Sequence, residues 1–203
     1  MSMCLSLATL SDENIQRVLA DPPLAWKVIA PDDEEFYRIA RREAVRPSFL
    51  ARLLGRKPEP LPEISAELEF SEGEGRIIDV DKAWQGLHYL LTGTAEGGEH
   101  PHNFLVVGGR GVADVEVGYG PARTFTAVET AEIHAALSAL SEETLRSRFA
   151  PRAMMDTHIY PEIWDRDPAD DDTLGYLMDN LPALREFLSS AAEQRFGMIV
   201  WLS

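Results

Sequence analysis

The alternation of apolar and polar positions predicts strands at both ends of the chain and near its middle. Residues 3–10 are mostly apolar and residues 198–202 are apolar throughout, which is typical of strands buried on both faces. Residues 104–107 form a similar run that two glycines end, and residues 114–119 alternate with a period of two. We therefore expect a mixed sheet of about four or five strands, with both terminal strands in it.

The clearest helical pattern lies between residues 79 and 91. Apolar side chains and one histidine recur there at helical spacing and form a continuous stripe: Val80, Trp84, Leu87, His88 and Leu91. Asp79 is a good N-cap, and Thr92–Gly93 is a good stop. The pattern predicts a helix that packs its stripe, with Trp84 as an anchor, against the core.

Capping residues mark the beginning of the other helices. Ser11 predicts a helix to about Ala20, and residues 126–129 have the pattern of a capping box. Ser141 predicts a further short helix. A long helix is expected over residues 171–192, with a kink at Pro182.

Residues 31–55 are helical in pattern but interrupted at Pro47, and Phe36, Ile39 and Ala40 share one helix face. The segment 56–76 is rich in proline, glycine and acidic residues, and we expect it to be a surface loop. The part of the chain before this loop is too short and broken to hold its own core. We therefore expect residues 1–203 to form a single α+β domain.

The net charge is −15, and it is unevenly distributed. Residues 1–60 hold nine basic and nine acidic residues, so the whole excess of acid lies beyond residue 60. Such a field repels phosphate backbones, which makes nucleic acid a poor partner. It favours a basic protein as partner, although solubility alone is also a common reason for an acidic surface.

The chain has one cysteine, Cys4, and no apolar run of transmembrane length. A single thiol cannot form an internal disulfide, and this pattern is typical of a reducing compartment. We expect a cytoplasmic protein that neither crosses nor binds a membrane.

Several segments resemble the YfbM-like family, a bacterial family of unknown function. They are residues 79–93, Val107–Gly109, Gly118–Arg123, Arg148–Phe149 and Ile159–Trp164. The resemblance extends over nearly the whole chain and departs from the family pattern at residues 2–4 and 46–76. It implies an α+β fold of this size. It implies no activity, substrate, cofactor or catalytic residue.

The groups that could bind a metal or cofactor form incomplete sets. His100 and His102 could share one metal ion in an extended segment, but no further ligand motif follows them. Residues 165–172 contain five aspartates but lack the glycine of a calcium loop. The glycines at 108–111 lack the lysine of a phosphate-binding loop. We expect no metal and no cofactor.

Two functional interpretations remain open, and a homo-oligomer with a structural or regulatory role is a third. The first is a non-catalytic, inhibitor- or immunity-type module that binds a basic protein. It would use the acidic group Asp165, Asp167, Asp170, Asp171 and Asp172 beside Tyr160 and Trp164. The alternative is a small-molecule enzyme or ligand-binding protein. Its pocket would be drawn from His88, Arg123, Tyr160 and Trp164, with Arg123 holding an anion.

Overall fold

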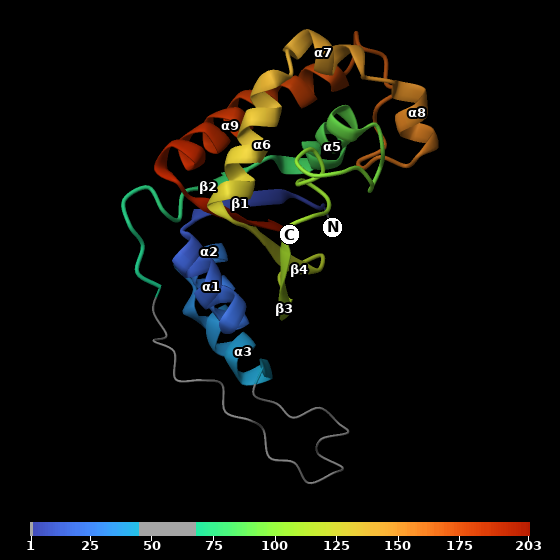
Figure 1. Cartoon of the computed structure of the whole chain (residues 1–203). Helices are drawn as coiled ribbons and strands as arrows, with labels where there is room; N and C mark the ends of the chain where they lie inside the picture. Colours follow the sequence, from blue (N-terminus) through green and yellow to red (C-terminus); the bar gives the residue numbers. More distant parts are fainter. Residues whose placement is uncertain (1, 45–67) are drawn as a thin grey trace.

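Five antiparallel strands form one open sheet in the computed structural model, which describes residues 2–44 and 68–203 (Figure 1). The strands are β1 (Leu5–Leu10), β2 (Ile77–Asp79), β3 (Arg110–Glu116), β4 (Pro121–Phe125) and β5 (Gly197–Leu202). Their order is β2-β1-β5-β4-β3, so the two terminal strands lie side by side and β3 lies at one edge. The predicted α+β class, the number of strands and the shared sheet of the termini are confirmed. The expected mixture of parallel and antiparallel pairs is not found, since every described pair is antiparallel.

Helices cover both faces of this sheet, as Figure 1 shows. One face carries the N-terminal helices α1 (Asp12–Ala20), η1 (Pro22–Leu24) and α2 (Ala25–Ile29), with α3 (Glu34–Ala44) packed on them. The other face carries η2 (Asp81–Ala83), α5 (Trp84–Thr92), α6 (Ala127–Ala139), α7 (Glu142–Ser147), α8 (Pro151–Asp156) and α9 (Thr173–Gln194). No helix within the described ranges is long and apolar enough to cross a membrane.

The two layers of helices bury two separate hydrophobic cores because side chains along a strand alternate between the faces of a sheet. Leu7 and Val200 point into the larger core under α5 and α9. Ala8 and Ile199, their neighbours in sequence, point into the smaller core under α1 and α2. Register pairs Leu7 with Val200 and Ala8 with Ile199, so each pair stays on one face.

Several predicted boundaries are confirmed by their caps. The Ser11 side chain accepts from the N–H of Asn14 at the start of α1, and Thr126 and Glu129 form the reciprocal capping box of α6. Ser141 caps α7 in the same way. The long helix α9 contains Pro182 and ends two residues later than expected, at Gln194.

Three predicted elements differ from the structure. The strand expected at residues 114–119 lies earlier in the chain, since β3 begins at Arg110 and ends at Glu116. Residues 104–107 form turns and no strand, although Phe104 and Leu105 are buried in the core as an apolar run suggests. The helix expected from Asp79 begins as the short helix η2 and becomes α-helical at Trp84. The interruption at Pro47 and most of the expected loop 56–76 lie outside the described residues. Its described end, residues 68–76, contains a turn and no helix.

Candidate functional site

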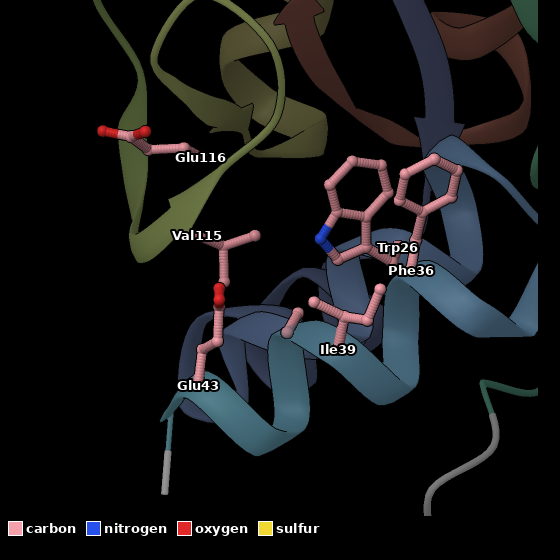
Figure 2. Close-up of a pocket in the computed structure, with 7 residues that line it drawn as sticks. Trp26, Phe36, Ile39, Glu43, Val115 and Glu116 are labelled. Carbon is pink, nitrogen blue, oxygen red and sulfur yellow. The ribbon is translucent and has the colours of Figure 1, made fainter. Parts of the chain in front are cut away.

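An open groove of about 450 Å³ lies between α3 and the edge strand β3 (Figure 2). Trp26, Phe36 and Ile39 form its apolar wall on the helical side, and Val115 faces them from β3. The rings of Trp26 and Phe36 are stacked with their centroids 4.7 Å apart. Phe36 is 45% exposed and Ile39 is 44% exposed, so this apolar wall is open to a partner.

Polar contacts on the opposite side of α3 fix the direction of this wall. Arg41 forms an ion pair with Asp21, whose side chain is fully buried. Lys27 Nζ lies 3.5 Å from Glu34 Oε1 and also sits over the ring of Tyr37, 4.8 Å from its centroid. These contacts tie α3 to α2 and to Asp21 between α1 and η1, and they leave Phe36 and Ile39 on the side that faces the groove.

The rim of the groove is acidic and lies beside an open sheet edge. Glu43 at the end of α3 and Glu116 at the end of β3 both line it, and Figure 2 shows them on the same side of the apolar wall. Within the described part of the chain, β3 has a strand neighbour only on its β4 side. An apolar wall, an acidic rim and a free strand edge are therefore next to one another.

Three of the residues predicted to form a pocket are gathered around α5. Gln85 Oε1 accepts from the backbone N–H of Tyr160 at 2.7 Å, and the Tyr160 ring stacks on Trp84 at 6.0 Å between centroids. Trp164 is buried against Gly86, and its indole N–H donates to the Ile159 carbonyl at 2.7 Å. Tyr160 and Trp164 therefore pack against α5, and His88 is part of it.

His88 is fully buried in α5, and neither of its ring nitrogens has a hydrogen bond of normal geometry to any described residue. Burial lowers its pKa to about 4, because the charged form loses its hydration. An interaction with the Gly97 backbone opposes this shift, and the positive charge of Arg123 adds to it. His88 is thus held neutral at physiological pH.

Arg123 is the only one of the four predicted residues that lines a small cavity of about 140 Å³ at the end of the sheet where the chain termini meet. Its guanidinium donates to the carbonyls of Leu105, Val107 and Gly108 at 3.0, 2.7 and 3.1 Å. Burial lowers the pKa of Arg123 to about 10. Trp84 lines the same cavity, while Trp164 lines a different hollow, so the four residues do not converge on one site.

Three of the five aspartates in residues 165–172 hold local structure together. Asp172 caps α9 by accepting from Gly175 N–H at 2.8 Å, and Asp171 pairs with Arg166. Asp167 accepts from the N–H of Ala169 at 2.9 Å. Asp165 and Asp172 line an apolar hollow of about 440 Å³ together with Trp164, whose side chain is itself buried.

The other candidate ligands do not form a metal site within the described ranges. His100 Nε2 lies 2.7 Å from Glu132 Oε2, and no group of three or more potential ligands is found among the described residues. Cys4 is half-buried, and burial raises the pKa of its thiol.

Sequence reasoning missed the groove, although one of its signals was visible. Phe36 and Ile39 share a helix face, and such a face is normally interpreted as a core face. Trp26 was missed altogether, because Pro22 and Pro23 indicate the end of a helix. In the structure both prolines lie in η1, which leads directly into α2.

The comparisons with known proteins agree on the fold and give no activity. The structure resembles the crystal structure of a "Protein of Unknown Function YfbM from Escherichia coli", with a TM-score of 0.62 and 16% identity. The match covers 98% of this chain and 99% of that chain, and at this identity it shows the fold alone. No functionally curated protein has a sequence that matches the chain. The family match covers residues 1–201, and the chain belongs to the family described as Domain of unknown function (DUF1877).

Proposed function

We propose that this chain is a non-catalytic binding module and that the groove between α3 and β3 holds an extended segment of a basic protein partner. The observation that carries the proposal is the exposed apolar wall of Phe36 and Ile39 beside the stacked ring of Trp26. Exposed apolar surface of this kind, rimmed by polar residues, commonly marks an interaction site. Aromatic side chains supply much of the affinity at such sites.

The shape and charge of the groove select the partner. Because β3 is a sheet edge, an extended segment can add to it as a further strand and place alternate side chains against Trp26 and Ile39. Glu43 and Glu116 at the rim favour lysine or arginine in the same segment. The net charge of −15 would also draw a basic protein toward the surface before contact.

The basic side chains of α3 do not oppose this choice strongly. Arg41 is paired with Asp21, and Arg38 Nη2 lies 2.9 Å from Glu34 Oε2. Both arginines, with Arg42 and Tyr37, border a separate hollow and not the groove. The groove itself is lined by two carboxylates and no cationic side chain among the described residues.

An enzyme with a pocket of His88, Arg123, Tyr160 and Trp164 is the weaker proposal. A proton-transfer role requires a side chain within reach of substrate. His88 is fully buried, and Trp164 is packed into the core with its N–H already bonded. Of the four residues, only Arg123 lines the small cavity at the end of the sheet, and Trp84 lines that cavity too.

A selection from a random library of displayed peptides tests the proposed function. The wild-type protein should enrich peptides that alternate apolar residues with lysine or arginine. The double variant Phe36→Ser and Ile39→Ser should not enrich them. Val128→Ser is the matched control, because Val128 is also apolar and 67% exposed but lies on α6, on the other face of the sheet.

Two outcomes would overturn the proposal. One is enrichment of the same peptides by wild type and the groove variant. The other is a concentration-dependent dimer, seen by sedimentation, that Phe36→Ser abolishes. In that case a second copy of the chain would occupy the groove.

A further inference from the structure

A small cavity lies at the end of the sheet, and what is inferred from it is independent of the function proposed for the groove. This cavity of about 140 Å³ is lined by Leu5, Trp84, Leu105, Tyr119 and Trp201, and among the described residues Arg123 is the only cationic side chain on its wall. Strand β4 carries Arg123 opposite Val200 of β5, which lines the cavity too. The fold thus places one guanidinium in mainly apolar surroundings.

The hydrogen bonds of Arg123 leave two of its five donors unused. Nη1 carries two hydrogens and donates to Val107 and Gly108, while Nη2 donates once, to Leu105. The remaining donors are on Nε and Nη2, and neither has a partner among the described residues. Nε is also not one of the fully buried polar atoms, so it keeps contact with open space. These two adjacent nitrogens can donate side by side to both oxygens of a carboxylate.

The charge of Arg123 is not neutralised by any carboxylate in the described part of the chain. None of the ion pairs includes it, and burial is the physical cause of its lowered pKa. Carbonyl oxygens satisfy hydrogens but carry no full negative charge. Arg123 is half-buried, and the Phe125 ring lies 5.7 Å from its guanidinium carbon, which compensates the charge only in part. A cation held there without a counterion is costly, and a bound anion would reduce that cost.

We propose that this cavity binds a small molecule that carries one carboxylate on an apolar body. The carboxylate would take the two unused donors of Arg123, and the apolar part would lie against Trp84 and Leu105. Pockets for drug-sized ligands begin at roughly 300 Å³, so a cavity of about 140 Å³ fits only a short-chain or single-ring acid. With one cation on an apolar wall, the site suits a monoanion better than phosphate, whose second charge would have no partner.

The structural role of Arg123 in holding residues 105–108 must be separated from ligand binding. Arg148 provides a matched control because it also donates to two carbonyls, those of Leu90 and Leu91, at 3.0 and 3.3 Å. Arg148 does not line the cavity. Arg148→Lys should therefore lose hydrogen bonds to backbone carbonyls, as Arg123→Lys does. It should leave the proposed ligand site unchanged.

Titration with acetate, butyrate and benzoate, followed by ¹⁵N NMR, tests the proposal on the full chain. We expect butyrate or benzoate to shift the Arg123 Nε–H and Trp84 indole signals with a Kd of about 1 mM or tighter. Benzamide and inorganic phosphate should leave both signals in place. Arg123→Lys should weaken binding by about tenfold to a hundredfold, since lysine keeps the positive charge but lacks the two adjacent N–H donors of the guanidinium group. Arg148→Lys should bind as wild type does.

Three results would overturn the inference. The first is no shift of either signal with any of the three acids up to about 10 mM, ten times the expected Kd. The second is an equal response to phosphate, which would indicate nonspecific anion binding. The third is equal weakening in Arg123→Lys and Arg148→Lys, which would leave Arg123 as a structural clamp only. None of them bears on the groove, whose test uses peptides and different variants.

Discussion

Trp26 and Phe36 stack face to face, with 4.7 Å between ring centroids and 12° between ring planes. They belong to different helices, α2 and α3, so the pair joins these helices and forms the wall of the groove at the same time. Phe36 remains 45% exposed in this arrangement. Because Phe36 is partly exposed, the pair can stabilise the contact between α2 and α3 and can also bind a partner.

The exposed wall should tolerate polar substitution. Ile39→Ser removes a side chain that is 44% exposed, and we expect it to cost less than about 1 kcal/mol in free energy of unfolding. Phe36→Ser also loses the stack on Trp26 and should cost about 1–2 kcal/mol. Urea denaturation of both variants checks this, and a cost above about 3 kcal/mol for either would place the wall in the core.

Gly86 should not tolerate alanine, despite the better helix propensity of alanine. A Cβ atom at Gly86 would lie 2.6 Å from Trp164 Cη2 and 2.7 Å from Leu177 Cδ2. Overpacking of this kind typically costs about 1–3 kcal/mol, which exceeds the gain of up to about 1 kcal/mol from helix propensity. Gly111→Ala is the control, since nothing lies within 4 Å of a Cβ there. Stabilisation by Gly86→Ala in thermal unfolding would show that α5 and Trp164 are not in close contact.

Helices and their caps could be predicted from local sequence, while the site could not. Ser11, Thr126 and Ser141 act within three residues of themselves, so short windows of sequence contain their signal. The fold class follows in the same way from apolar runs such as residues 198–202. By contrast, an apolar run alone does not distinguish a strand from a buried turn, and residues 104–107 are a turn.

Long-range contacts explain most of what sequence reasoning missed. The carbonyls of Leu105, Val107 and Gly108 turn toward Arg123, which is 15 or more residues away in sequence. The exposure of Phe36 depends on how far β3 lies from α3 at the sheet edge. Neither relationship leaves a periodic signal. Arg123 itself could be named from the sequence as an anion-binding candidate, but the isolation of its charge became visible only in the structure.

Stability should fall between pH 7 and pH 5.5 because of His88. Its pKa is lowered from 6.5 to about 4 in the folded protein, so the unfolded chain takes up the proton first as the pH falls. The contribution of His88 to the free energy of unfolding is fully present above pH 6.5 and is lost as the pH falls toward 4. From pH 7 to 5.5 the loss should be about 1 kcal/mol.

Variants isolate this contribution from that of other titrating groups. His88→Leu should remove about 1 kcal/mol of the pH dependence measured by urea denaturation. Val128→Ser, which removes an exposed side chain without a titrating group, should leave the pH dependence as in wild type. A wild-type pH dependence in His88→Leu would mean that His88 is accessible to protons in the folded state.

The acidic segment at residues 165–172 should divide into structural and solvent-facing aspartates. Asp172→Ala removes the N-cap of α9 and should cost about 1 kcal/mol. Asp170→Ala, at an exposed neighbour, should cost less than about 0.5 kcal/mol. Equal stability losses in the two alanine variants would contradict the assignment of the cap.

If a basic partner is steered by this segment, the double variant Asp165→Asn and Asp170→Asn should lower the association rate of that partner, mainly at low salt.

The most direct test of the binding proposal is the affinity of one selected apolar, basic peptide for three proteins, measured by isothermal titration calorimetry. The proteins are wild type, the double variant Phe36→Ser and Ile39→Ser, and the control Val128→Ser. We predict a loss of at least tenfold in the double variant, which is about 1.4 kcal/mol, and no change in the control. Equal affinity for all three proteins would contradict the account, because the peptide would then bind without the apolar wall of the groove.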